Sequence, residues 1–384
     1  MRLFFERTLR ILDKSEDITF ICAGVGVTFK TDEKLFAGWT KYYFAEYFEQ
    51  SDKIVLNNKV YATGNGKIFQ TAKKITSIFK CDANINTFKI DANLDFICCK
   101  NELPSKDEFT YYFLDKQKKC VLIIVSLNYI EAKYIPMRVI RALISLLLAN
   151  KGWFYFHSAC LVYKGFGIGI IGNKLAGKTT CIMNLMYKNG YNLLSNDKIA
   201  LEKKDGVVNA QGFPIAIGVR IGTIRLFSIL RQTTQNTEYF NPDTTIKKYR
   251  HLTHFQLKDI DKKIFFLPKE IVSVFNVSIV PTAPIRLLLI PQYDNTLHKP
   301  KLIKLSQQKT KAILQNQYLP NICPEQNFIE KFIGLDKRKL KVKYNTFIEN
   351  AQHTIPCYKL IHNESTNKES ACLVQNLIDK LFAA

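Results

Sequence analysis

Short apolar runs separated by polar turns fill the first 130 residues of the chain. Residues 18–30 contain two such runs and predict a strand pair, and residues 110–127 place apolar runs on both sides of the charged turn "KQKK" and predict a hairpin. Residues 53–100 alternate apolar runs with turns such as "TGNGK", which predicts antiparallel sheet. Residues 35–48 are rich in aromatic residues and fit either a helix or a strand. We therefore expect a β-rich extension over residues 1–130, a region that is available to bind a substrate or a partner.

The pattern changes after residue 130, where helical spacing alternates with strand-like runs. Residues 134–152 repeat apolar positions at helical spacing, and residues 159–172 form two apolar runs around a Lys-Gly turn. Residues 178–190 predict a helix that ends at a glycine, and residues 191–197, "YNLLSND", predict a buried strand followed by a polar pair. Strands that alternate with helices indicate an α/β fold with a mixed β-sheet over residues 131–384.

A phosphate-binding loop joins the second of these strands to the helix. Residues 172–179, "GNKLAGKT", match the pattern G-x-x-x-x-G-K-[ST]. In such a loop the backbone N–H groups face phosphate oxygens, the lysine (Lys178) reaches the β- and γ-phosphates, and the hydroxyl of Thr179 can ligate Mg²⁺. An ordinary glycine turn is the alternative, and it leaves the Gly-Lys-Thr run unexplained. The motif predicts nucleotide contacts from Gly172, Asn173, Lys174, Leu175, Ala176, Gly177, Lys178, Thr179 and Thr180.

Three further side chains are candidates for chemistry beside that loop. A phosphoryl-transfer site needs a carboxylate near the metal, and Asp197 follows the next apolar strand, where a turn aspartate is also common. A hairpin that turns at Lys164–Gly165 would bring His157 to the loop, although a histidine among apolar residues is more often structural. Arg220 fits a second cation for the phosphoryl group and fits a solvated edge-strand arginine equally well. The catalytic candidates are therefore His157, Asp197, Lys178 and Arg220.

Composition narrows the class of protein and of ligand. Of the 384 residues, 47% are hydrophobic, and the net charge is +22. Residues 1–150 carry 22 Lys and Arg against 17 Asp and Glu, whereas residues 151–384 carry 33 against 16. The excess in the loop-bearing half suits phosphate ligands, and a lysine-rich composition bias explains it as well. Ten cysteines without a C-x-x-C pair, no apolar leader and no bilayer-length apolar run predict a cytoplasmic protein without a membrane segment.

The residues around the loop resemble the HPr kinase/phosphorylase-like family, P-loop proteins whose fold is related to phosphoenolpyruvate carboxykinase. The resemblance spans roughly residues 120–384. It is carried by "HSACLVYKGFGIGIIG", "GKTT", "GYNLLSND", Gly212-Phe213-Pro214, Arg220-Ile221-Gly222-Thr223, the helical pair Arg138 and Arg141, and the closing residues Pro356, Tyr358 and Leu360. The resemblance implies a P-loop kinase core of this type with a mixed β-sheet. It also implies ATP and Mg²⁺ as cofactors, with the metal at Thr179 and Asp197, and it favours a functional role for His157.

Two positions separate the chain from HPr kinases proper. Thr180 stands where those enzymes carry an acidic residue, and Asn196-Asp197 replaces their paired aspartates. Because Asn196 cannot act as a base, either His157 or Asp197 takes that role, or the chain only binds or hydrolyses nucleotide.

These observations predict an ATP/Mg²⁺-dependent phosphotransferase that acts on a hydroxyl of a peptide, a protein or a small molecule other than HPr. The alternative is a nucleotide-binding or weakly hydrolysing ATPase partner in a peptide-modification or regulatory complex. A nucleic-acid-dependent NTPase is a third hypothesis, motivated by the basic half, but nucleic acid is not the expected partner. The composition leaves a homo-oligomer open.

Overall fold

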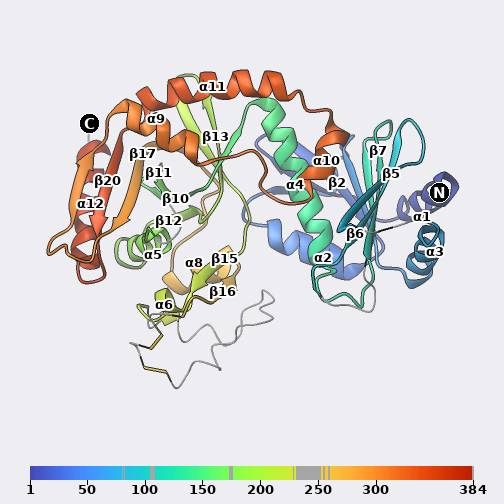
Figure 1. Cartoon of the computed structure of the whole chain (residues 1–384), viewed down its shortest axis with the longest axis horizontal. Helices are drawn as coiled ribbons and strands as arrows, with labels where there is room; N and C mark the ends of the chain where they lie inside the picture. Colours follow the sequence, from blue (N-terminus) through green and yellow to red (C-terminus); the bar gives the residue numbers. More distant parts are fainter. Residues whose placement is uncertain are drawn as a thin grey trace. The chain divides into compact units, whose positions relative to one another are not determined.

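The described part of the chain in this computed structural model is residues 1–79, 81, 83–103, 109–172, 176–227, 229–230, 252–253, 256–257 and 260–382. The chain forms two units. Unit 1 comprises Met1–Lys151 and Asn321–Leu340, and unit 2 comprises Gly152–Pro320 and Lys341–Ala384. Each unit is an α/β arrangement built on one main mixed sheet, as Figure 1 shows. The helix that the sequence groups with the second region, α4 (Tyr134–Lys151), lies in unit 1. The functional division at residue 130 stays a prediction.

The main sheet of unit 1 has eight strands in the order β3-β1-β2-β4-β8-β7-β6-β5. Strands β2, β4 and β8 are parallel neighbours, and the remaining pairs are antiparallel. The strands are β1 (Ile18–Cys22), β2 (Val25–Thr31), β3 (Glu49–Ser51), β4 (Lys59–Thr63), β5 (Ile85–Lys89), β6 (Leu94–Lys100), β7 (Phe109–Asp115) and β8 (Cys120–Ile124). The predicted strand pair at 18–30 and hairpin at 110–127 are confirmed as β1–β2 and β7–β8.

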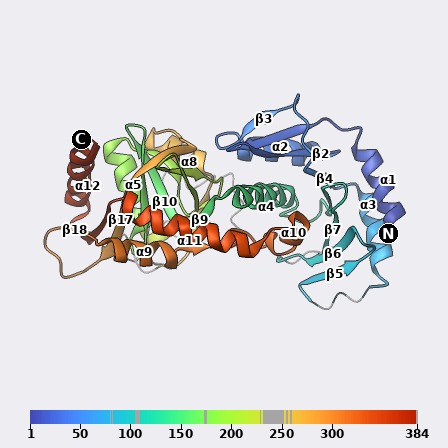
Figure 2. The same ribbon diagram turned by 90° about the horizontal axis from the view of Figure 1, so that it is seen from above.

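Helices cover both faces of this sheet, so that every residue of β8 is buried. Helices α1 (Arg2–Leu12) and α3 (Gly66–Thr76) pack with the strands into a core rich in phenylalanine, which includes Phe5, Phe96 and Phe113. Helix α4 packs on β2 and β4, and α2 (Lys34–Phe44) and α10 (Gln326–Ile333) pack on α4. Figure 2 shows the same helices from above.

Residues 53–100 are not the purely antiparallel sheet that the sequence predicts, because they contain helix α3. Asn65 caps this helix by accepting hydrogen bonds from the backbone N–H groups of Lys67 and Ile68, at 3.0 and 3.3 Å. The buried residues of α3 recur three and four positions apart and form one face. The "TGNGK" run is therefore a helix start rather than a hairpin turn. Residues 35–48, for which two structures were open, form α2 and the turn after it.

The main sheet of unit 2 has ten strands. Its path is β12-β10-β11-β17-β14-β13-β9-β19, and β20 pairs with both β17 and β18. The strands are β9 (Phe154–Phe156), β10 (Ser158–Tyr163), β11 (Phe166–Ile171), β12 (Asn192–Ser195), β13 (Ile199–Lys204), β14 (Val207–Gly212), β17 (Thr282–Tyr293), β18 (Lys301–Lys304), β19 (Tyr318–Leu319) and β20 (Cys357–His362). A separate hairpin pairs β15 (Ile217–Arg220) with β16 (Lys263–Phe266).

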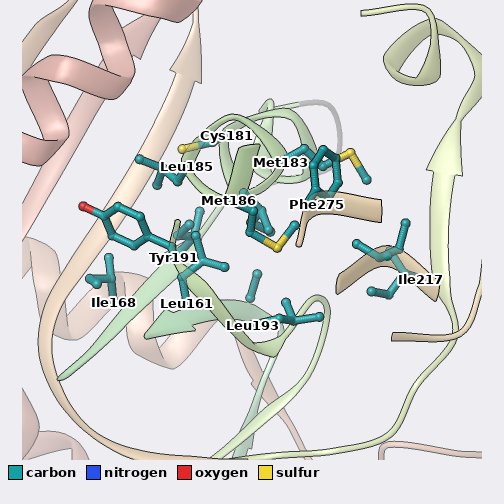
Figure 3. Close-up of a cluster of buried hydrophobic side chains, with 14 of the residues drawn as sticks. Leu161, Ile168, Cys181, Met183, Leu185, Met186, Tyr191, Leu193, Ile217 and Phe275 are labelled. Atoms are coloured by element: carbon teal, nitrogen blue, oxygen red, sulfur yellow. The ribbon is translucent and has the colours of Figure 1, made fainter. Parts of the chain in front are cut away.

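The helices of unit 2 lie beside this sheet. They are α5 (Lys178–Asn189), α6 (Ile221–Ile224), α8 (Pro268–Phe275), α9 (Gln307–Asn316) and α12 (Asn367–Phe382), while α11 (Lys337–Thr354) begins in unit 1 and continues into unit 2. Helix α5 ends as predicted at Gly190, which adopts φ +66° and donates its N–H to the carbonyl of Met186. Figure 3 shows Met183 and Met186 of α5 packed in the core with strand residues such as Leu161 and with Phe275 of α8. This core fixes the helix whose first turn carries the phosphate-loop lysine.

Two further sequence-based expectations concern the whole chain. No helix of the described residues is both long enough and apolar enough to cross a membrane. All ten cysteines are free, and seven of them are buried.

Candidate active site

Three parallel strands of unit 2 end at one edge of the sheet. The pairing of β11 with β17 aligns Ile170 with Leu289, and the pairing of β17 with β20 aligns Tyr293 with His362. Ligands of α/β sheets bind outside the carboxyl ends of parallel strands. Gly172, the first residue of the phosphate loop, follows β11 directly and therefore lies at an edge suited to a ligand.

The end of the phosphate loop is also the start of α5. Gly177 caps the helix in the left-handed conformation, with φ +89°, and Lys178 is the first helical residue. Ala176, Gly177, Thr179 and Thr180 belong to the described residues, whereas Asn173, Lys174 and Leu175 lie outside them. The predicted nucleotide contacts of all these residues stay predictions.

His157 reaches the loop because β10 and β11 form the predicted hairpin around Lys164–Gly165. Their register pairs Ser158 with Ile171, which brings His157 to the position opposite Gly172. The Nζ atom of Lys178 lies 3.3 Å from Nε2 of His157. The same amine donates a hydrogen bond to the carbonyl oxygen of Gly172. The amine thus joins the histidine to the loop backbone.

Asp197 lies on the other side of the same imidazole. It follows β12, and its Oδ1 atom is 3.4 Å from Nδ1 of His157. The two side chains are 35% and 37% exposed, so that both remain open to solvent or to a ligand. The structure thus brings together three of the four catalytic candidates, in the order Asp197, His157, Lys178.

Asp197, His157 and Lys178 thus form a row of neighbouring side chains. Arg220, the fourth candidate, is not part of this row. It ends β15, and its guanidinium forms an ion pair with Asp261. Within the described ranges, no hydrogen bond or ion pair joins Arg220 to His157, Lys178 or Asp197. Its role in the chemistry stays a prediction.

Burial and neighbouring charges set the protonation of the row. Burial is the largest cause that lowers the pKa of His157; the carboxylate of Asp197 opposes it, and Lys178, Lys198 and Lys263 lower the pKa further. Burial also lowers the pKa of the Lys178 amine, with Asp197 opposing and Lys263 adding to the effect. A histidine with a lowered pKa is neutral at pH 7 and can accept a proton.

Sequence reasoning missed two lysines beside this row. The pairing of β9 with β13 aligns Phe156 with Ile199, which places Lys198 across from His157. Its position directly after Asp197 is a signal that was available in the sequence. Lys263 begins β16 and pairs with Arg220 across the β15–β16 hairpin. No sequence signal identifies Lys263, because its strand is distant in the chain from the loop.

Sequence reasoning also missed His362, which lies behind the phosphate loop. This residue is 3% exposed, and a Cβ atom at Gly177 would lie 2.8 Å from its Nε2. Burial lowers the pKa of His362, and hydrogen bonds to the Asn367 side chain and the Ala176 backbone oppose the shift. The imidazole therefore fills the space that any larger residue at position 177 would need.

The two predicted metal ligands are of the right kind for Mg²⁺. This ion prefers oxygen donors, keeps several waters, and is held by one or two carboxylates together with substrate phosphates. The hydroxyl of Thr179 and the carboxylate of Asp197 fit that requirement. Across the ranges that the structure describes, no group of three or more His, Cys, Asp or Glu is placed to hold a metal by protein ligands alone.

Comparison with known proteins finds a likeness among solved structures. No protein-family model matches the chain, and no curated protein matches it. Among solved structures, the chain is similar to the Hpr(Ser) kinase/phosphatase from Coxiella burnetii, with 14% sequence identity over 49% of this chain and 98% of that chain. The TM-score of 0.22 is too low to establish a shared fold.

Proposed function

We propose that the chain is an ATP/Mg²⁺-dependent phosphotransferase with a P-loop core of the HPr kinase and phosphoenolpyruvate carboxykinase type. It transfers the terminal phosphate to a hydroxyl of a peptide, a protein or a small molecule. One observation carries the proposal: Lys178 of the phosphate loop lies 3.3 Å from His157, whose other ring nitrogen lies 3.4 Å from Asp197. A cation for phosphate, a base for a hydroxyl and a carboxylate for a metal are what such a transfer requires.

The contacts of His157 favour one tautomer. The ammonium of Lys178 can only donate, so Nε2 of His157 is the acceptor and Nδ1 carries the proton that faces Asp197. In this state Nε2 has the lone pair that a general base needs, and Asp197 would stabilise the imidazolium that forms. When Lys178 turns to the β- and γ-phosphates of the nucleotide, Nε2 becomes available to the acceptor hydroxyl.

Each residue of the row then has a role in the transfer. His157 takes the proton of the acceptor hydroxyl, whose oxygen forms a bond to the terminal phosphorus. The bond from that phosphorus to the bridging oxygen breaks, and its electron pair leaves with the nucleoside diphosphate, next to Lys178 and the N–H groups of the loop. Thr179 and Asp197 would hold Mg²⁺, which supplies charge neutralisation on the phosphates when bound. Arg220 would act only if it leaves Asp261.

Labelled-phosphate transfer tests the proposal. ATP labelled at the terminal phosphate is incubated with serine peptides and hydroxy acids, and label on the acceptor is measured for the wild type, Lys178→Ala and Asp197→Asn. We expect transfer by the wild type and little by either variant. Lys204→Ala is the matched control, because this exposed lysine lies at the far end of β13. Wild-type transfer rates in Lys178→Ala would contradict the proposal.

A nucleotide-binding partner with weak hydrolysis is the second candidate function. The observation that favours it is Asn196, an amide that precedes the single carboxylate Asp197 at the end of β12. Under this hypothesis the chain binds ATP tightly, and hydrolysis releases free phosphate without labelling an acceptor. Label on any acceptor that disappears in both His157→Gln and Asp197→Asn would exclude it.

A further inference from the structure

We propose that the chain forms a homodimer through the outer edge of β5 (Ile85–Lys89), which pairs antiparallel with β5 of a second copy of the chain. Strand β5 ends the strand order of the unit 1 sheet and pairs with β6 on its inner side, as Figure 2 shows. Within the described residues, no strand pairs with its outer side. The inference does not depend on the proposed reaction, because every residue that carries it lies in unit 1.

Two backbone hydrogen bonds show which groups of β5 face outward. The N–H of Lys100 donates to the carbonyl oxygen of Asn84 at 2.8 Å, and the N–H of Ile90 donates to that of Leu94 at 2.9 Å. In an antiparallel ladder, every second residue exchanges both of its backbone bonds with the same neighbouring strand. The even-numbered residues of β5 therefore bond to β6, and the N–H and C=O groups of the odd-numbered residues point away from it.

The outward groups belong to Ile85, Thr87 and Lys89, and the structure shows no hydrogen bond from them to any described residue. Their order matches its own reverse. In an antiparallel pair centred on Thr87, this residue faces its own copy, and Ile85 faces Lys89 of the second copy. Three such pairs exchange about six backbone hydrogen bonds. The edge is therefore complementary to itself about a two-fold axis.

The side chains favour this register. Threonine pairs are favourable across strands, and Thr87 forms one at the axis. Ile85 is 43% exposed, and the apolar stem of Lys89 from the second copy can cover it. The two lysines stand four positions apart along the ladder, roughly 13 Å, which exceeds the Debye length at physiological salt. A register centred on Lys89 would instead place them directly opposite each other, which is destabilising.

Other sheet edges carry features that block such pairing. Strand β3, at the opposite edge of the same sheet, has three residues and begins with Glu49. In unit 2, β19 has two residues, and β18 has a lysine at each end. Short strands and edge lysines are devices that keep sheet edges from pairing with other chains. Strand β5 has five residues and one lysine, at its end, so its edge is less protected than these three.

Apolar side chains flank the β5 edge on both faces of the sheet. Ile85 lies on one face, and Phe88, on the other face, packs on the core of unit 1. The ring centroid of Phe79 lies 4.7 Å from that of Phe88, which places the end of the α3 segment beside β5. Phe79 follows Ile78, which is 80% exposed. A strand that adds to this edge can therefore bury apolar surface as well as form hydrogen bonds.

Sedimentation velocity over roughly 2 to 200 μM protein measures the dimer. Because one pair of edge strands buries less than the ~1,200 Å² of stable complexes, we expect a weak dimer whose share rises across this range. Both copies carry a net charge of +22, so salt should strengthen the association rather than weaken it. A wild type that stays monomeric at the highest concentration and about 0.5 M salt would overturn the inference.

Two variants test the edge itself, with circular dichroism as the check on folding. Thr87→Pro removes an outward N–H, keeps the ladder to β6 and should abolish the dimer. Ile85→Lys places a lysine opposite Lys89 of the second copy and should weaken the dimer roughly tenfold, so it serves if the proline variant does not fold. Ile54→Lys is the matched control, because Ile54 is 42% exposed and its carbonyl accepts a hydrogen bond from Thr19 near the opposite edge. An undiminished dimer in Thr87→Pro, or equal losses in the two lysine variants, would contradict the inference.

Amide hydrogen exchange read by NMR tests the register. In dilute protein, the amides of Asn86 and Phe88 should be protected by β6, whereas those of Ile85, Thr87 and Lys89 should exchange quickly. At a concentration where the dimer dominates, the latter three should exchange roughly five- to tenfold more slowly. Dimerisation that leaves these three amides unprotected would assign the dimer to another surface.

Discussion

In each unit, three parallel strands end at the same edge of the sheet. The residues that follow these strands carry different charges in the two units. In unit 1, Asp32 follows β2 and accepts a hydrogen bond of 3.0 Å from the hydroxyl of Thr63, the last residue of β4. Gly64 comes next, and a Cβ there would lie 2.5 Å from the side chain of Leu127. Side chains of unit 1 thus occupy part of this edge.

The edge of unit 2 instead carries Lys178, His157 and the start of α5. Burial lowers the pKa of Lys178 and His157 there, whereas burial raises the pKa of Asp32 and Glu33 in unit 1. A partly buried lysine beside a helix N-terminus attracts an anion, and a pair of carboxylates repels one. The direction of the strands creates a possible site in both units, but the residues after the strands decide what can bind.

The largest expected effect is the loss of nucleotide turnover, and we expect it from a substitution at the edge of unit 2 but not at that of unit 1. Lys178→Met removes the cation that faces the phosphates and should lower nucleotide turnover at least ~10³-fold. Asp32→Asn changes the equivalent edge of unit 1 and should leave turnover within about twofold. Turnover of both variants is measured at saturating Mg²⁺. A comparable loss in Asp32→Asn would show that the edge of unit 1 also takes part in turnover.

His157 should produce the next largest effect and a distinctive pH profile. Replacing it in His157→Gln removes the general base and should slow transfer about 10²-fold. Because the pKa of His157 is lowered below its ordinary value of 6.5, the wild-type kcat/KM should stay constant as the pH falls to 6.5 and decline only below it. The decline should be absent in His157→Gln. A decline that persists in the variant would show that a group other than His157 is the base.

The strands and the helix that position Asp197, His157 and Lys178 could be predicted from the sequence. The residues that reach this row from distant segments could not. The apolar runs before and after Lys164–Gly165 defined β10 and β11, and a hairpin with a fixed turn has one register, so His157 had to reach Gly172. The motif likewise defined the start of α5 at Lys178. Local pattern was sufficient wherever one turn set the geometry.

Contacts between distant segments were not predictable in the same way. Lys263 reaches the site through strand pairing with β15, and His362 reaches Gly177 through three aligned parallel strands. No local pattern specifies either contact. Helix α3 is the case in which a local pattern was misinterpreted. Asn65 and Gly66 fit a turn and a helix cap equally well, and only the packing of the buried helix face against the sheet decides between the two.

A smaller effect, on stability, is expected from Gly177 at the start of α5. Gly177→Ala forces a Cβ onto a left-handed residue and against His362, and should reduce the free energy of unfolding by about 2–3 kcal/mol. Gly190→Ala, also left-handed but with nothing within 4 Å, should cost about 1 kcal/mol. Denaturant unfolding measures both. Adding His362→Ala should recover part of the Gly177→Ala loss but none of the Gly190→Ala loss.

The smallest expected effect concerns Asp32 and has the opposite sign. The pKa of this carboxyl is raised in the folded chain, chiefly by burial, so the stabilising contribution of its protonated form is present at low pH and is lost as the pH rises through the folded pKa. At pH 7 the ionised carboxyl therefore weakens the fold. Asp32→Asn keeps an oxygen for the Thr63 hydroxyl and removes the charge.

Because Asp32 is exposed as a whole residue, solvent screening should hold the gain in unfolding free energy within about 0.5 kcal/mol at pH 7. The gain should vanish near pH 3, where both side chains are neutral. Thermal unfolding at the two pH values measures it, and an equal gain at both would show that charge is not the cause.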